Sequence, residues 1–173
     1  MHRDPGRLPG AQLIATGVTL RQEAAEDEAF LRRLYFAVRA EDFGLLGLPE
    51  EALHQFIGHQ FAMQRAQFLQ RREDSDWWIV ERDGAPVGRL YVLHQPDHDY
   101  LTDIALLPEM QGQGIGGALI DRVQADAAAR GVGVQLHVDP FRPARRLYLA
   151  RGFRELVLEG ADILMAWEPE GSS

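Results

Sequence analysis

Four glycines within six residues mark a segment whose backbone could bind a phosphate group. The segment is Gln111-Gly112-Gln113-Gly114-Ile115-Gly116-Gly117, and it lies between a predicted strand and a predicted helix. Because glycine has no side chain, the main chain there can approach a bulky anion, and the first amides of a helix have no partner within the helix. No acidic residue occurs between Gln111 and Ile120. The spacing therefore favours a main-chain phosphate site.

Other interpretations of these glycines are weaker. Gly112-x-Gly114-x-x-Gly117 matches the spacing of the dinucleotide fingerprint, and Asp139 follows at a predicted strand end. In a dinucleotide-binding fold, however, the glycine turn directly follows its strand, whereas residues 108–111 intervene here. No Gly-Lys-Ser/Thr is present, which excludes a Walker-type loop. A turn without any ligand is disfavoured because each glycine lowers helix stability. A dinucleotide-binding protein stays as an alternative.

The composition excludes several classes of protein. A length of 173 residues predicts a single domain with one core. With 18 Lys and Arg against 26 Asp and Glu, the net charge of -8 disfavours a nucleic-acid surface. The absence of cysteine excludes disulfides, thiolate metal sites and a cysteine acyl-enzyme. No apolar run is long enough to span a membrane, so we expect a cytoplasmic protein without a membrane or nucleic-acid partner.

The patterns around the glycine segment predict a mixed α/β layer fold rather than a regular βα repeat. Strands are expected at 17–22, 77–82, 86–93, 100–107, 132–138, 153–158 and 162–167, and helices at 26–41, 49–68, 114–130 and 142–151. The first two helices are expected to bury Phe30, Leu31, Leu34, Tyr35, Val38, Leu53, Phe56, Ile57, Phe61 and Phe68. We place a single domain at 16–169, after a flexible tail at 1–15 and before a disordered end at 170–173.

The glycine segment and its flanks together resemble the GNAT N-acyltransferase superfamily. The family signature Gln/Arg-x-x-Gly-x-Gly/Ala is matched by Gln111-x-x-Gly114-x-Gly116. Downstream, Ala144-x-x-Leu147-Tyr148-x-x-x-Gly152-Phe153 extends the match. The resemblance covers roughly residues 77–167. It implies a mixed, mostly antiparallel central sheet of about seven strands flanked by four helices.

The resemblance implies an N-acetyltransferase that moves an acetyl group directly from acetyl-CoA to a primary amine, without a metal. The coenzyme diphosphate would lie on the glycine segment, and the pantetheine arm would pair with the preceding strand. The implied coenzyme-binding residues are Ile104, Ala105, Leu106, Gln111, Gly112, Gln113, Gly114, Ile115, Gly116 and Gly117. Tyr148 would act as general acid toward the leaving thiolate, because a phenol keeps its proton at neutral pH. A core tyrosine without a catalytic role is the alternative.

The chain departs from the family pattern just before Tyr148. Many members have an asparagine near the start of that helix, whereas this chain contains no asparagine. Asp139-Pro140-Phe141-Arg142-Pro143 fills the region, and Asp139 could cap the helix instead. A non-catalytic acyl-CoA-binding module is therefore kept as the alternative function.

An ammonium acceptor must lose a proton before it attacks, and several side chains on or near the central strand could receive it. These candidates are His94, His98, Asp99, Tyr100, Thr102 and Asp103. A metal site at 94–99 is also conceivable, but a solvated polar turn explains the same residues more simply.

The expected acceptor is a small-molecule or peptide amine. In the family the first two helices help to line its pocket, and this region offers aromatic and acidic groups suited to a cation. They are Tyr35, Phe43, Phe56, Phe61, Glu41, Asp42, Glu50 and Glu51. Each is explained individually as core packing or solvated charge. The sequence leaves open the identity of the amine, the acyl length and whether the chain forms a homodimer.

Overall fold

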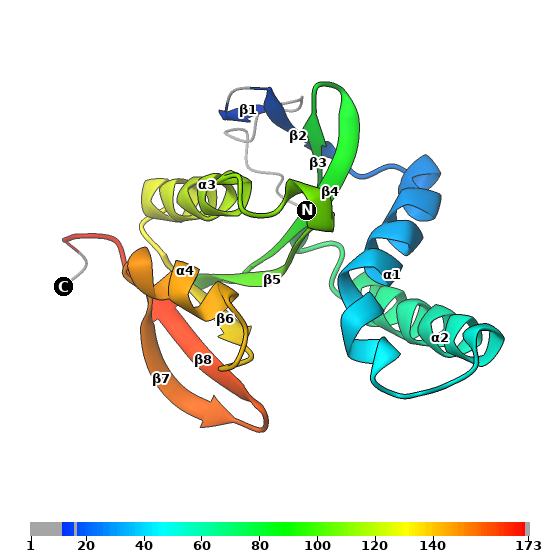
Figure 1. Cartoon of the computed structure of the whole chain (residues 1–173). Coiled ribbons are helices and arrows are strands. Elements are labelled where there is room, and N and C mark those ends of the chain that lie inside the picture. The colour runs from blue at the N-terminus through cyan, green and yellow to red at the C-terminus, as the bar shows by residue number, and fades with distance from the viewer. Residues whose placement is uncertain (1–11, 16, 172–173) are drawn as a thin grey trace.

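The structure is a computed structural model that describes residues 12–15 and 17–171. The described strands form one sheet in the order β1-β2-β3-β4-β5-β6-β8-β7, and helices lie on both of its sides (Figure 1). The strands are β1 (Gln12–Ala15), β2 (Val18–Gln22), β3 (Ser75–Arg82), β4 (Ala85–His94), β5 (His98–Leu106), β6 (Gly133–Val138), β7 (Arg154–Glu159) and β8 (Asp162–Trp167). The helices are α1 (Glu28–Gly44), α2 (Glu50–Leu69), α3 (Ile115–Ala129) and α4 (Ala144–Ala150).

The expected mixed, mostly antiparallel sheet with four helices is confirmed. Among the described strands, β5 and β6 form the one parallel pair, and every other pair is antiparallel. The structure has eight described strands rather than about seven. The additional strand is β1, which pairs with β2. It lies in the segment 1–15 that was expected to be a flexible tail. Residues 1–11 of that tail and 172–173 of the expected disordered end lie outside the described residues.

Each face of the sheet has its own hydrophobic core. Residues of α1 and α2 pack against Ile79 on one face. Residues of α3 and α4, including Tyr148, pack with Leu90, Leu101 and Leu136 on the other face. Separate helix pairs therefore flank the central strand β5 on opposite sides (Figure 1).

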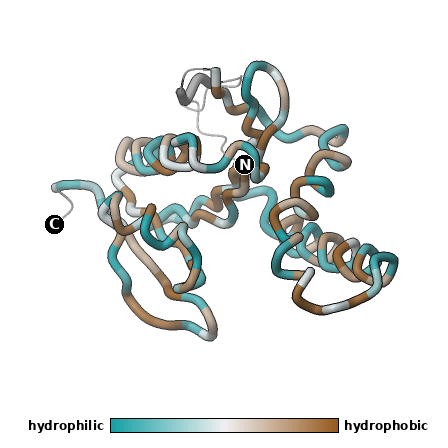
Figure 2. The backbone as a smooth tube through the Cα atoms, viewed as in Figure 1, coloured by the Kyte–Doolittle hydropathy of each residue, from teal (hydrophilic) through white to brown (hydrophobic). Residues whose placement is uncertain are grey.

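Two residues of α1 and α2 that were expected in the core are instead partly exposed to solvent. Val38 on α1 and Phe56 on α2 are each 36% exposed. Both lie toward the ends of the helices that meet at the connecting loop, which projects beyond the sheet (Figure 1). That loop is coloured as hydrophobic in Figure 2, and its Leu45, Leu46 and Leu48 are exposed. The helical stripe of apolar residues therefore continues further than the sheet that it covers.

A β-bulge on β5 changes the direction of its side chains. Val92 of β4 pairs with Leu101 and Tyr91 pairs with Asp103, so Thr102 is the extra residue. In a regular strand, residues 101 and 103 would share a face. With the bulge, Leu101 packs in the α3 core, whereas Asp103 pairs with Tyr91, which contacts Phe68 of α2. The bulge thus directs the Asp103 carboxylate toward α1 and α2.

Candidate active site

A cavity opens where β5 and β6 separate. The two strands pair only from His98 to Tyr100 with Gly133 to Gln135, so the rest of β5 has no partner on that edge among the described strands. The cavity has a volume of about 140 Å³ and draws its lining from β5, β6 and α4. The lining residues are Leu101, Thr102, Asp103, Ile104, Leu136, His137 and Tyr148. We call it the central cavity.

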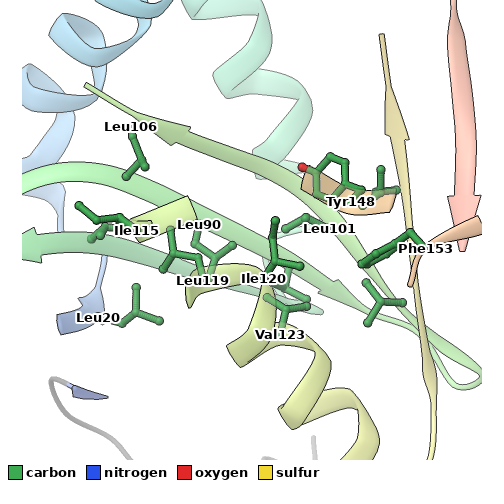
Figure 3. Close-up of a cluster of buried hydrophobic side chains, with 14 of the residues drawn as sticks. Leu20, Leu90, Leu101, Leu106, Ile115, Leu119, Ile120, Val123, Tyr148 and Phe153 are labelled. Atoms are coloured by element: carbon green, nitrogen blue, oxygen red, sulfur yellow. The ribbon is translucent and has the colours of Figure 1, made fainter. Parts of the chain in front are cut away.

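Tyr148 presents its hydroxyl group to the central cavity. The side chain is 5% exposed, and its ring packs edge-on against Phe153 with centroids 5.6 Å apart. The hydroxyl oxygen points away from Phe153 (Figure 3), and it makes no hydrogen bond to the described part of the chain. Burial, together with the nearby charge of Asp103, raises the pKa of Tyr148 above its usual value. Tyr148 is therefore protonated at neutral pH and has a proton available for a ligand.

The glycine segment folds as an exposed turn that ends in the first turn of α3. Gly112 and Gly114 have φ angles of 73° and 81°, which lie in the left-handed region that residues other than glycine rarely adopt. Gly114 is the residue before α3, and the first turn of that helix has no acidic side chain. Within the described residues, the amides of Gly112, Gln113 and Gly114 have no hydrogen-bond partner. These exposed amides are suited to an anion.

The other residues of the segment hold the turn in place. The Gln111 side-chain amide donates to the Leu106 carbonyl oxygen at 3.1 Å, and the Gln113 amide donates to the Glu109 carbonyl oxygen at 2.8 Å. Arg82 donates to the Gln113 side-chain oxygen, which brings a cationic side chain to the turn. A Cβ atom at Gly117 would lie 2.1 Å from a nitrogen at the end of the Arg151 side chain, so a larger residue there would displace that side chain.

The strand that precedes the turn runs beside the central cavity. Ile104 lines this cavity and packs against the α3 core. Ala105 packs against the α1 and α2 core instead, and Leu106 belongs to the α3 core. Beyond Tyr100 the main chain of β5 pairs with β4 on one edge only. A ligand with amide groups could therefore pair with the other edge.

A second cavity lies on the opposite face of β5, against α1 and α2. Its volume is about 70 Å³, and we call it the helix-side cavity. The lining residues are Leu34, Tyr35, Val38, Arg39, Gln64, Arg89, Asp103, Ile104 and Ala105. Asp103 and Ile104 line both cavities. The two cavities therefore meet at the same short stretch of β5.

The six candidate bases occupy different places. Thr102 and Asp103 line the central cavity. His94 and Asp99 instead form a partly buried cluster with Arg130, in which the His94 Nδ1 atom lies 2.6 Å from Asp99. The solvated turn expected at 94–99 is therefore wrong for Asp99, which is 1% exposed because it is paired with a histidine and an arginine.

The remaining candidate bases are His98 and Tyr100. His98 pairs with Asp97 at 2.9 Å and lines neither of the two cavities. The Tyr100 hydroxyl lies 2.7 Å from Nδ1 of His137, and Nε2 of His137 lies 2.7 Å from a Glu159 oxygen. His137 itself lines the central cavity. A chain of three titratable side chains therefore extends from this cavity to the surface.

Several residues of the two cavities were not singled out from the sequence. These are Arg39, Gln64, Arg89 and His137. His137 lies between Leu136 and Val138 in β6. This alternation indicates that His137 faces the opposite side of the sheet, but it does not indicate which side chains His137 contacts.

Of the expected acceptor residues, only Tyr35 lines the helix-side cavity. Phe61 is buried in the core, and Asp42 pairs with Arg142 at 2.5 Å.

Metal-binding clusters and membrane-spanning helices are both absent from residues 12–15 and 17–171. No group of three or more histidine, cysteine, aspartate or glutamate side chains in these ranges could hold a metal ion. No helix in that part of the chain is long and apolar enough to cross a bilayer.

The central strands separate, a glycine turn precedes α3, and a buried tyrosine lines the cavity between the strands. Solved structures share this fold. An N-acetyltransferase described as PaiA from Thermoplasma acidophilum, in complex with coenzyme A, has a TM-score of 0.70 and 17% identity, covering 88% of this chain and 99% of its own. An acetyltransferase from Thermus thermophilus has a TM-score of 0.65 and 20% identity, covering 88% of this chain and 97% of its own.

A third similar structure comes from Salmonella typhimurium. It is an acetyltransferase that modifies the N-terminal serine of ribosomal protein L7/L12, with a TM-score of 0.65 and 17% identity, covering 93% of this chain and 100% of its own. The model of the acetyltransferase (GNAT) family matches residues 45–153. The chain therefore belongs to the GNAT family of acetyltransferases, as its motifs predicted.

Proposed function

We propose that this chain transfers the acetyl group of acetyl-CoA directly to a primary amine, with Tyr148 as general acid. The observation that carries the proposal is the unpartnered hydroxyl of Tyr148 in the central cavity, beside the free edge of β5. Similar structures support it, since one contains coenzyme A and another belongs to an enzyme that modifies an N-terminal serine.

The residues present fit the coenzyme. Its diphosphate would accept hydrogen bonds from the exposed amides at 112–114 and from the first turn of α3, where the helix dipole also favours negative charge. Arg82 would add a positive charge next to the turn. The pantetheine amides would pair with the free edge of β5 at 104–106 and bring the thioester to Tyr148. Of these three residues, Leu106 already uses its carbonyl oxygen in the bond from Gln111.

The chemistry is a direct displacement. The acceptor nitrogen bonds to the acetyl carbon as the carbon–sulfur bond breaks, and Tyr148 gives its proton to the sulfur. Of the three protons on the original ammonium, one stays on the amide, one replaces the Tyr148 proton, and one leaves to solvent. The burial that raises the pKa of Tyr148 also disfavours a free thiolate, so proton transfer to sulfur is favoured in this cavity.

We assign the proton that leaves to solvent to His137. A neutral imidazole with its Nε2–H directed at Glu159 keeps Nδ1 as an acceptor, which the Tyr100 hydroxyl occupies in this structure. Displacement of that hydroxyl by the ammonium would let His137 take the proton. Glu159 would stabilise the imidazolium and lies at the half-exposed end of the chain, from which the proton reaches solvent.

Calorimetry with coenzyme A, followed by thiol release from acetyl-CoA over a panel of primary amines, tests the proposal. We expect binding and amine-dependent thiol release. Tight binding with no turnover on any amine would instead support the non-catalytic acyl-CoA module. Thermal protection by NAD but not by coenzyme A would support the dinucleotide alternative.

A further inference from the structure

We infer that the acceptor carries a carboxylate close to its amine, and that it is a small amino acid bound in the helix-side cavity. The inference rests on the proposed function and names the substrate class of that site. It follows from the charges, the unsatisfied donor and the size of this cavity.

The helix-side cavity is cationic although the protein is acidic. Its lining contains two arginines, Arg39 and Arg89, and one carboxylate, Asp103. The cavity lining therefore carries one excess positive charge, while the whole chain carries a net charge of -8. A purely cationic amine, which the aromatic and acidic residues of this region suggested from sequence, would meet repulsion here. A carboxylate on the acceptor would offset the charge of its own ammonium group and give the two arginines an anionic partner.

Arg89 has a hydrogen-bond donor with no partner. Its Nε atom donates to Asp103 at 2.5 Å, and its Nη2 atom donates to the Gln64 side-chain oxygen at 2.8 Å. The Nη1 atom is buried and makes no hydrogen bond to the described residues. The side chain is only 3% exposed, so solvent cannot easily satisfy this donor. An unsatisfied buried guanidinium nitrogen is costly, and a ligand carboxylate is its natural partner.

Arg39 supplies a second cation on the cavity wall. It stacks over the Tyr35 ring at 5.5 Å from the ring centre. Within the described part of the chain it forms no ion pair with a carboxylate. Its guanidinium is therefore available to a ligand carboxylate from the α1 side of the cavity.

The position of Asp103 orients the acceptor. Asp103 lines both cavities, so an ammonium group drawn to it lies next to the place where the thioester would be. The carboxylate of the same molecule would then point toward Arg39 and Arg89.

The rest of the wall is apolar, with Leu34, Val38 and Ala105, and the volume of about 70 Å³ leaves room for a small side chain only. Glycine and L-alanine sample the suitable sizes.

The test compares each of these amino acids with its primary carboxamide. The two members of each pair differ chemically only in that the carboxylate is replaced by an amide. The amine of the carboxamide is less basic, so more of it is unprotonated at neutral pH, and this difference alone would favour the carboxamide. We expect kcat/KM to favour the amino acid by about tenfold or more, because the carboxamide offers no anionic partner to Arg39 or to the Nη1 atom of Arg89. Equal turnover, or preference for the carboxamides, would overturn the inference.

Substitution at Arg39 assigns the preference to the cavity. Arg39→Gln should reduce the ratio of kcat/KM for the acid over that for the carboxamide about tenfold, and Arg39→Lys should retain part of this ratio. Arg33→Gln is the matched control, since Arg33 is also on α1, stacks on one aromatic ring at 5.4 Å and does not line the cavity. An unchanged preference in Arg39→Gln would overturn the assignment.

Thermal shifts separate this inference from the proposed function. The melting temperature is measured with each amino acid or carboxamide, with and without coenzyme A. If no amine is turned over, the proposed transfer fails, but greater stabilisation by the acids than by the carboxamides would still support the carboxylate site. Stabilisation by neither set, or equally by both, would overturn it.

Discussion

The two sides of β5 are built in different ways. On the side of α3, the coenzyme candidates lie in two neighbouring runs, 104–106 and 111–117, and Tyr148 lies in a second recognisable segment. On the side of α1 and α2, the helix-side cavity takes its charged residues from α1, β4 and β5 and its amide from α2. Main-chain recognition of a phosphate leaves a local trace in the sequence, because glycines must adopt special conformations. Recognition of an acceptor by side chains from separate elements leaves no such local trace in the sequence.

This difference between the two sides of β5 indicates which part of the site can vary in sequence. The proposed phosphate site depends on two left-handed glycines and on free amides at one helix start. The helix-side cavity depends on which side chains four separate elements bring together, and one substitution there would change its charge. Acceptor choice can therefore diverge while coenzyme binding stays the same.

Removal of the Tyr148 hydroxyl should have the largest effect on the coenzyme side. Tyr148→Phe should lower kcat by about 100-fold or more, since general acid catalysis typically contributes that much. The affinity for coenzyme A and the melting temperature should hardly change, because the hydroxyl has no hydrogen bond to lose within the described structure. Steady-state kinetics, calorimetry and thermal unfolding check the three expectations. Full activity in this variant would remove Tyr148 from the mechanism.

His137 tests whether the acceptor side contributes to proton transfer. His137→Gln should lower kcat by about tenfold and shift the rising limb of the pH–rate profile to higher pH, because the ammonium must then lose its proton to water. Glu159→Gln should have a smaller effect in the same direction. His98→Gln is the control, since His98 also pairs with a carboxylate but lines neither cavity. An identical pH profile for His137→Gln would contradict the assignment.

The glycine turn can be tested with two glycines at opposite ends of α3. Gly114→Ala and Gly131→Ala both place alanine at a left-handed φ, at 81° and 73°, with open space around the new Cβ atom. Each should cost about 1–2 kcal/mol of folding free energy. Only Gly114→Ala should weaken coenzyme A binding, by about tenfold, because distortion there moves the phosphate-binding amides. Equal affinities by calorimetry would argue against this turn as the diphosphate site.

The cluster around Asp99 should affect stability but not activity. Burial alone would raise the pKa of Asp99, but the hydrogen bonds and charges of His94 and Arg130 lower it overall. Because the folded pKa lies below the unfolded value, the stabilisation is present above about pH 4 and is lost as the pH falls through the folded value. Asp99→Asn should cost about 2 kcal/mol at neutral pH and flatten the acid limb of the stability curve. Chemical denaturation between pH 3 and pH 7 measures both effects.

The same variant also sharpens the comparison with His137. Both histidines contact a carboxylate, but His94 lies at the turn between β4 and β5 and lines neither cavity, whereas His137 lines the central cavity. Asp99→Asn should therefore leave kcat/KM unchanged at neutral pH. A large loss of activity would show that the two sites are coupled through β5.

Much of the architecture could be predicted because it depends on local patterns. The apolar alternation of the strands and the helical stripes located every described α-helix and every described strand except β1. Two helix positions, Val38 and Phe56, were misjudged because periodicity shows which face of a helix is apolar but not where the covering sheet ends. The cluster of Asp99 with Arg130 was missed because its members are 31 residues apart.

The sequence by itself determined the family, the glycine turn and the segment that carries Tyr148, since each is a short run of residues whose local conformation or chemistry is distinctive. The tertiary structure alone decided which side chains line the helix-side cavity, where we propose that the acceptor binds. The bulge at Thr102 turns Asp103 toward α1, and the packing of α1 and α2 on the sheet places Arg39 and Arg89 on the wall of one cavity. These positions depend on strand register and helix packing, which couple residues far apart in the chain.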